Sequence, residues 1–215
     1  MNLQFSNANV EESVSEDTNL MIIRTKSWGG LLKHRMAPGG FLRLVERLQY
    51  EQWLAIVNAG FGGILSIRTK LIPKSLARWL LEKYDPWDNS LSLANGKLLI
   101  DEEDVHATLG LPMGEFEVNE GCTSDDDMQF LDDWRRRWHV KRVVEWKKDK
   151  TKFFTGSLLF LMLFYMDRVQ FRGRKVERSF PVAIEWDIDK VRSRDKDEQL
   201  SGGYGKGRIL ERIDY

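Results

Sequence analysis

The chain has 215 residues, of which 42% are hydrophobic and 31% are charged, so it is long enough to bury a substantial core and its composition excludes wholesale disorder. Its formal net charge of zero conceals a segregation, because residues 115–133 hold eight acids and no base, whereas residues 135–152 hold nine bases and two acids. The single cysteine, Cys122, excludes an intramolecular disulfide framework and a cysteine-rich zinc site, and it favours a reducing compartment.

Residues 1–37 are predicted to form a flexible acidic arm, because the first half is polar without periodicity and the glycine pair at 29–30 interrupts the rest. A single helical domain is expected over residues 38–200. It begins with two apolar patterns of helical spacing, one on residues 41–48 and one on residues 51–59. The second pattern stops at Gly60, since glycine readily takes the positive φ that ends a helix.

The segment after this glycine is predicted to reverse direction and then to form a short extended stretch at residues 64–68. Pro73 suits the first turn of the next helix, where its missing N–H has no partner to lose. Trp79 is expected on the buried side of this helix. Asp85-Pro86 ends it, because a residue before proline is displaced from the α region.

A β-hairpin is predicted at residues 90–93 and 97–100, because an Asn-Gly pair of the kind that favours tight type I′ turns lies between them. Asp101 is then expected to cap a short helix. Asp104, three residues later, resembles the acidic partner of a capping box. The helix is predicted to end at Gly110.

Three further helices are expected. Residues 125–140 carry aspartates at their start and arginines toward their end, which complements the helix dipole. Residues 153–169 are the most apolar stretch and are predicted to form the centre of the core, whereas residues 187–200 are expected to form a surface helix. Residues 201–215 are expected to be a Gly-rich C-terminal tail. The predicted fold class is mainly α, a compact multi-helix domain with one or two small β-hairpins.

The sequence contains no catalytic constellation, so we predict that the chain is not an enzyme and holds neither a cofactor nor a metal ion. The C-terminal glycines do not form a phosphate-binding loop, since Gly207 follows Lys206 where a serine or threonine is required. The three histidines lack metal-ligand spacing. The aspartates at 125–127 offer oxygen ligands for Mg²⁺, although a first-turn charge cluster is favoured. An enzyme would require a pocket that joins Cys122 or His106 to other polar groups.

Bases alternate with tryptophans between residues 134 and 152. On one surface, such bases would neutralise phosphates while the indoles stack on unpaired bases, and the same basic residues would suit nuclear import. The alternative is that the tryptophans face the core and the bases are solvated or pair with the acidic segment. The candidate nucleic-acid or partner contacts are Arg135, Arg136, Arg137, Lys141, Arg142, Lys147, Lys148 and Lys150.

Three stretches carry a resemblance to a known family. They are residues 59–65 with their Gly-Phe-Gly-Gly run, residues 73–86, and residues 104–114 with Asp-Val-His-Ala-Thr-Leu-Gly-Leu-Pro. Together with weaker similarity elsewhere between residues 40 and 210, they resemble the plant mobile domain, also called the aminotransferase-like plant mobile domain, of transposon-derived plant proteins. The motif residues, which we expect to be structural, are Gly60, Phe61, Gly62, Gly63, Trp79, Asp85, Pro86, Asp104, Val105, Leu109, Gly110, Leu111 and Pro112.

The resemblance implies a mostly helical domain in nuclear or transposon-encoded plant proteins linked to genome maintenance and silencing, with no agreed catalytic residues. We therefore expect a non-enzymatic module that binds another protein, either as a regulator in silencing or as a recruited lineage-specific toxin or regulator. A nucleic-acid-binding module is the alternative. The expected location is the nucleus or cytoplasm, because no signal or transit peptide is visible and the apolar run at residues 158–166 is too short to span a bilayer. The sequence leaves the oligomeric state open.

Overall fold

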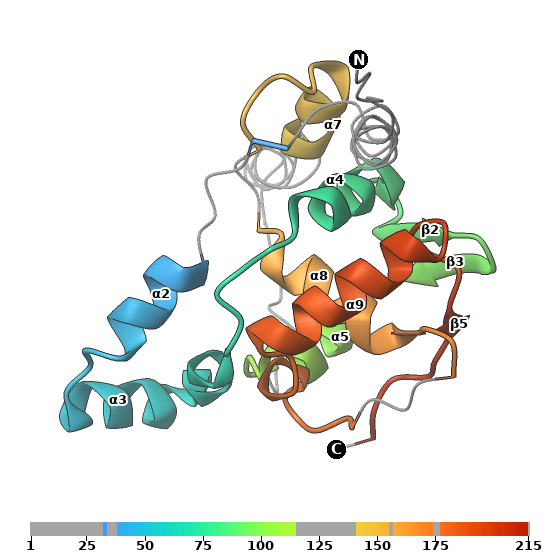
Figure 1. Cartoon of the computed structure of the whole chain (residues 1–215). Helices are drawn as coiled ribbons and strands as arrows, with labels where there is room; N and C mark the ends of the chain where they lie inside the picture. The colour runs from blue at the N-terminus through green and yellow to red at the C-terminus, as the bar shows by residue number, and fades with distance from the viewer. Residues whose placement is uncertain (1–31, 34–37, 115–140, 155–156, 174–176, 215) are drawn as a thin grey trace, which may run out of the picture. The chain divides into compact units, whose positions relative to one another are not determined.

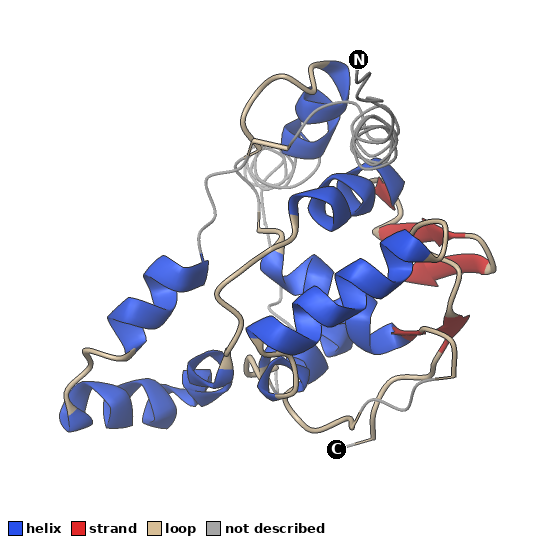
Figure 2. Cartoon of the chain, viewed as in Figure 1, coloured by secondary structure: helices blue, strands red, loops and turns tan. Residues whose placement is uncertain are grey.

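The computed structural model describes residues 32–33, 38–114, 141–154, 157–173 and 177–214. Helices dominate this part of the chain, and its strands belong to a three-stranded sheet and a two-stranded pair, both antiparallel (Figure 1, Figure 2). The predicted fold class is confirmed. None of the described helices combines the length and the apolar character that crossing a bilayer would require. The helix expected at residues 125–140 lies outside the described residues.

The described helices begin with α2 (Pro38–Val45) and α3 (Tyr50–Ile56), followed by a π-helical turn η1 (Val57–Phe61) and a 3-10 turn η2 (Gly62–Ser66). Gly60 takes a φ of 83° inside η1 and kinks the helix there, which matches the predicted helix stop. The extended stretch predicted at residues 64–68 is wrong over residues 64–66. Gly62 keeps a right-handed helical conformation, so the chain makes another helical turn before it extends.

Helix α4 (Lys74–Lys83) leads into the three-stranded sheet of β1 (Tyr84–Asp85), β2 (Ser90–Leu93) and β3 (Gly96–Leu99). The predicted hairpin is confirmed, but its turn is displaced by one residue. Leu93 pairs with Gly96, so Ala94 and Asn95 form the two-residue turn. The Asn95 side-chain amide donates to the Gly207 carbonyl at 3.1 Å, so a contact with the C-terminal segment helps to fix this turn.

Helix α5 (Glu102–Leu109) has the predicted ends. Asp101 Oδ1 accepts the Asp104 N–H at 2.9 Å, and Asp104 Oδ2 accepts the Asp101 N–H at 3.2 Å, which completes the capping box. Gly110 closes the helix with a φ of 62°. Helix α7 (Lys141–Lys148) is the next described element.

Helix α8 (Leu159–Arg168) lies at the centre of the core, as the apolar run predicts. All of its side chains except those of Phe160 and Arg168 are buried, and it contacts α4, α5 and η4. The chain then passes through β4 (Val169–Gln170), η4 (Val182–Ile184), α9 (Ile188–Leu200) and β5 (Arg208–Ile209). The predicted surface helix α9 has a buried side that carries charge, since Arg194 and Glu198 lie there beside Val191.

The predicted C-terminal tail instead belongs to the domain over its described length. Tyr204 is buried, the Gly205 N–H donates to the Tyr165 hydroxyl at 2.8 Å, and β5 pairs with β4. Gly203 and Gly205 take positive φ angles, which lets the chain turn back after α9. The end of the predicted arm also contacts the domain, because Leu32 is buried there.

Candidate functional site

The Gly-Phe-Gly-Gly run and the Leu-Gly-Leu-Pro run contact each other directly. A Cβ atom on Gly63 would lie 2.5 Å from the Cα of Gly110, and one on Gly60 would lie 3.3 Å from the Cβ of Pro112. Pro181 closes the same crossing, since its Cβ would lie 3.1 Å from a Cβ on Gly110. These glycines therefore permit two backbones to touch, and they do not form a cradle for a ligand.

The remaining motif residues have different surroundings, from the core (Trp79) to a turn (Asp85), a cavity wall and the exposed surface (Phe61). Trp79 is buried, and its ring contacts those of Tyr165 and Tyr204 at centroid distances of 5.2 Å and 5.6 Å. Asp85 Oδ1 accepts the Trp87 N–H at 3.0 Å, which holds the turn before β2. The motif residues that line the cavity are Pro86, Val105 and Leu109.

Asp104 connects α5 to α8 and to the C-terminal segment. Its carboxylate is buried, and it pairs with Arg168 and, at 3.0 Å, with Arg212. Arg212 also pairs with Asp101 at 2.5 Å and with Glu103. A buried carboxylate requires such partners, so Asp104 is an anchor as well as a helix cap. The sequence predicts the cap, whereas the arginines are 64 and 108 residues away and are not visible from local spacing.

A second buried polar cluster joins α8, α9 and the C-terminal segment. The Tyr165 hydroxyl donates to Glu198 at 2.5 Å and accepts the Gly205 N–H at 2.8 Å. Arg194 pairs with Glu198 and donates to the Val169 carbonyl. Burial raises the pKa of the Tyr165 hydroxyl, and the Glu198 carboxylate raises it further, so this hydroxyl remains a donor. These groups satisfy one another's hydrogen-bonding capacity, so the cluster serves to hold α8, α9 and the C-terminal segment together.

The described part of the basic segment is largely engaged with the protein. Lys147 donates to the Tyr84 carbonyl at 2.6 Å, and Lys150 pairs with Glu82 at 2.7 Å. Burial lowers the pKa of the Lys147 ammonium. Trp146 is buried and therefore does not present a face on which a nucleotide base can stack.

The other predicted contact residues fall in different places. Arg142 lines the cavity, Lys148 is exposed, and Lys141 begins α7. The part of α7 that is described thus does not gather its bases into one open surface, and nucleic-acid binding stays a prediction. The predicted contacts outside the described residues are Arg135, Arg136 and Arg137.

Packing and hydrogen bonding also account for His106. Its ring packs against that of Phe180 in a tilted arrangement with a centroid distance of 4.9 Å, and its Nδ1 lies 2.5 Å from the Leu111 carbonyl oxygen. His106 does not line the cavity, and Cys122 lies outside the described residues. Across the described ranges, no three His, Cys, Asp or Glu side chains are grouped so that they could share a metal ion.

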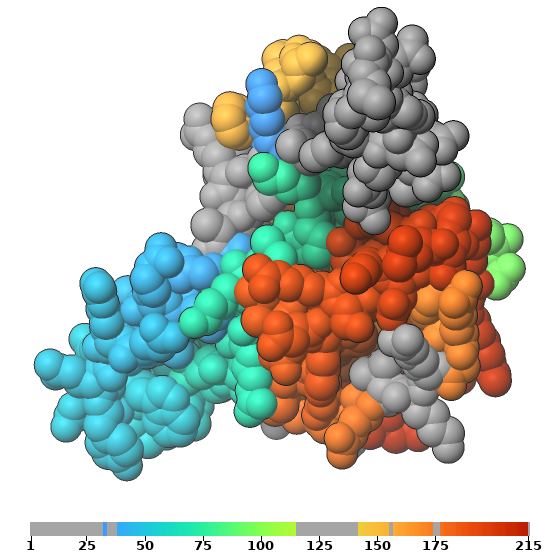
Figure 3. All heavy atoms as spheres, in the orientation of Figure 1, coloured from blue at the N-terminus to red at the C-terminus, as the bar shows by residue number. Residues whose placement is uncertain are grey.

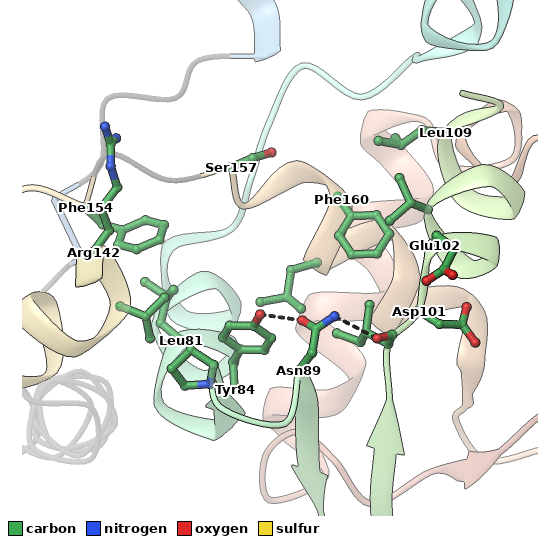
Figure 4. A pocket seen from close by; sticks show the side chains of 15 residues that line it. Leu81, Tyr84, Asn89, Asp101, Glu102, Leu109, Arg142, Phe154, Ser157 and Phe160 are labelled. Carbon is green, nitrogen blue, oxygen red and sulfur yellow. Dashed lines mark hydrogen bonds between the residues drawn. The ribbon is translucent and has the colours of Figure 1, made fainter. Parts of the chain in front are cut away.

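The cavity has a volume of about 700 Å³ and lies between α4, the three-stranded sheet, α5, α7 and α8 (Figure 4). Three aromatic rings line it, those of Tyr84, Phe154 and Phe160. The Tyr84 hydroxyl donates to Asn89 Oδ1 at 2.6 Å, and the Asn89 amide donates to the Ile100 carbonyl at 2.7 Å. This chain of hydrogen bonds fixes the Tyr84 ring in the wall.

Charged groups lie on opposite sides of this cavity. Asp101 and Glu102 lie together at the start of α5, and Arg142 lies beside Phe154 at the other side of the view in Figure 4. Asp101 pairs with Arg212, whereas Glu102 forms no hydrogen bond or ion pair with any described residue. Among the charged side chains of the wall, Glu102 is therefore the one that can pair with a bound ligand.

A smaller apolar hollow of about 280 Å³ adjoins the cavity. The two share Leu109, Ser157 and Phe160, and the hollow continues to Phe41 on α2 and Ile64 on η2. Phe160 is the only apolar residue of α8 that is not buried, because its side chain borders both of these spaces.

Helix α3 lies at the surface of the molecule (Figure 3), and three exposed large apolar side chains form a stripe along it. Tyr50 is 69% exposed, Trp53 43% and Leu54 37%, and α3 has no buried residue. Their spacing of i, i+3 and i+4 places them on one side of the helix. Leu44 before α3 and Phe61 after it are also exposed. The apolar periodicity of this segment is confirmed as helical, but its stripe is not covered by the described part of the chain.

A family profile with the description "Domain of unknown function (DUF8566)" matches residues 34–142. No curated protein and no solved structure matches the chain. The matched range includes the crossing at Gly63 and Gly110, the stripe on α3 and most of the cavity wall, whereas α8, α9 and β5 lie beyond it.

Proposed function

The chain belongs to the family described as a domain of unknown function (DUF8566), and for this member we propose a non-enzymatic role as a protein-interaction module that docks an amphipathic helix of another protein on α3. The observation that carries the proposal is the exposed stripe of Tyr50, Trp53 and Leu54. Soluble proteins rarely leave adjoining large apolar side chains in water unless a partner covers them.

The chemistry of the stripe favours a helical partner. Tyrosine and tryptophan are the residues that most often dominate binding energy at protein interfaces. A helix with apolar residues at i, i+3, i+4 and i+7 offers the matching ridge. Arg47 and Glu51, which flank Tyr50 in the sequence, are exposed and carry opposite charges, so this segment has no net charge that would call for a highly charged partner.

We also propose kinship with the plant mobile domain, and with it a nuclear role in genome maintenance or silencing, or a role as a recruited toxin or regulator. The support is that two of the three stretches that carry the resemblance, residues 59–65 and 104–114, meet at Gly63 and Gly110 and so act as one packing unit. A partner captured through α3 would decide among these roles.

The test is site-specific photo-crosslinking in extracts of the source tissue. A benzophenone amino acid replaces Tyr50, and in a second sample it replaces Trp87, which is 78% exposed in a turn away from α3. We expect a discrete adduct with one other protein from position 50 only. The crosslinked peptide of that protein should carry apolar residues at i, i+3, i+4 and i+7.

A matched pair of variants provides the control. Leu54→Asp should abolish the adduct, whereas Ala55→Asp adds the same charge to the next exposed position and should retain it. Adducts of equal yield from positions 50 and 87, adducts only with a second copy of the chain, or an adduct that survives Leu54→Asp would each overturn the proposal.

A further inference from the structure

We propose that the cavity between α4 and α8 is a binding site for a compact organic cation, an ammonium group attached to an apolar body. This site is separate from the stripe on α3 and does not depend on a protein partner. Its volume of about 700 Å³ lies within the range of roughly 300–1,000 Å³ typical of small-molecule sites. The cavity is the primary observation, and its lining selects the ligand.

The wall is apolar and held in place from several directions. Leu81 on α4, Ile100 after β3 and Leu161 on α8 are buried residues that contribute to it. Tyr84 is fixed through Asn89, as described above. Because buried packing and these hydrogen bonds already hold this part of the wall in place, less entropy is lost when a ligand binds.

The aromatic rings favour positive charge. Tyr84, Phe154 and Phe160 present π-systems to the same space, and the face of such a ring attracts an ammonium group. Methylated ammonium groups suit rings especially well, because their hydration is weak and their methyl groups also fill apolar space. The apolar body of the ligand would occupy the aliphatic part of the wall.

The Glu102 carboxylate determines where in the cavity the cation would bind. Glu102 lines the cavity together with Phe160, on the side away from Arg142, and it has no partner among the described residues (Figure 4). Its neighbour Asp101 is neutralised by Arg212, and Arg142 lies on the opposite side. A cation bound against Phe160 would therefore approach Glu102 and stay away from Arg142.

The test compares three probes of similar size by NMR titration of the full chain. Benzyltrimethylammonium is the cation, 2,2-dimethylpropylbenzene (neopentylbenzene) is its uncharged isostere, and benzenesulfonate is an anion. We expect saturable binding of the cation, with chemical-shift changes concentrated at the backbone amides of Tyr84, Glu102 and Phe160. The isostere and the anion should bind more weakly by about tenfold or more.

Two substitutions test the assigned residues. Glu102→Gln should weaken binding of the cation by about three- to tenfold, whereas Glu103→Gln, one position along the same helix and outside the cavity wall, should leave it unchanged. Phe160→Ala should abolish binding, with circular dichroism to verify the fold. The proposal is overturned if the cation does not saturate at millimolar concentration, if the isostere or the anion binds as well, or if the two glutamine variants behave alike.

Discussion

Gly63 and Gly110 lie with their backbones in direct contact, so that a Cβ on Gly63 would come within 2.5 Å of the Cα of Gly110. Gly110 has a φ of 62°, whereas Gly63 has no positive φ, so the two positions require glycine for different reasons. At Gly63 the requirement is space alone. At Gly110 it is both space and backbone conformation.

Gly63→Ala should therefore destabilise the fold by about 3 kcal/mol or more, because the methyl group has to displace backbone atoms. Chemical denaturation measures this change. Gly62→Ala is the control, since its Cβ would have ordinary contacts at 3.5 Å and Gly62 has a helical φ of −55°. It should change stability by less than about 1 kcal/mol, with stabilisation favoured. Equal losses in the two variants would contradict the close approach.

The buried pair of Arg194 and Glu198 is suited to a double-mutant cycle. Arg194→Met or Glu198→Leu alone leaves a buried charge without its partner, which costs about 3–5 kcal/mol. The double variant should be much more stable than the sum of the single losses predicts. Urea denaturation of all four proteins gives the coupling energy. Additive losses would show that the two side chains are independent.

Asp195 should give stability an unusual dependence on pH. Burial raises its pKa, although hydrogen bonds from Tyr204 and Gln199 lower it in part. The folded protein therefore holds this proton more tightly than the unfolded chain. The stabilisation is complete below the ordinary aspartate pKa of about 4, and it is lost as pH rises through the higher folded value.

Denaturation of the wild type and of Asp195→Asn across this pH window isolates the effect. The unfolding free energy of the wild type minus that of the variant should decrease as pH rises from about 4 toward neutrality. An NMR titration of the carboxyl carbon provides an independent reading of the pKa. A difference that increases with pH would give the opposite sign and contradict the assignment.

Gly205 should be intolerant of a side chain because it touches Trp79. A Cβ at this position would lie 2.6 Å from the Trp79 ring, and Gly205 also has a φ of 78°. Gly173 has a similar φ of 66°, but a Cβ there would have no atom within 4 Å. Alanine at this position therefore measures the cost of the backbone conformation without a steric clash. We expect Gly205→Ala to cost about 2 kcal/mol more than Gly173→Ala and to alter the near-UV signal of the tryptophans. Equal costs would mean that the contact with Trp79 contributes nothing.

Elements defined by local chemistry could be predicted from the sequence, and elements defined by distant contacts could not. The capping box of Asp101 and Asp104 and the stop at Gly110 depend on residues a few positions apart, and all three were predictable. The integration of residues 201–214 was not, because it depends on Tyr165 and on β4, which lie far away in the sequence. A run of glycines is compatible with both a loose tail and a tight return.

The candidate sites show the same limit. The helical spacing of Tyr50, Trp53 and Leu54 is visible in the sequence, but exposure depends on whether another element covers the stripe. The cavity was not predicted, since its wall combines α4, α5, α7, α8 and the sheet. Glu102 is one acid among four consecutive candidates at residues 101–104, and only its lack of a partner distinguishes it.

Because α8 packs against α4 and α5, the end of the family match and the end of the folding unit lie at different residues. The family profile ends at residue 142, yet α4 and α5 within that range bury their apolar sides against α8, and Asp104 finds its arginines at positions 168 and 212. A fragment of residues 34–142 would thus expose half of an interface, and a fragment of residues 143–215 would expose the other half. The two pieces are a natural complementation pair: separately expressed, each should be insoluble or unfolded, and mixed they should reassemble without a peptide bond between them.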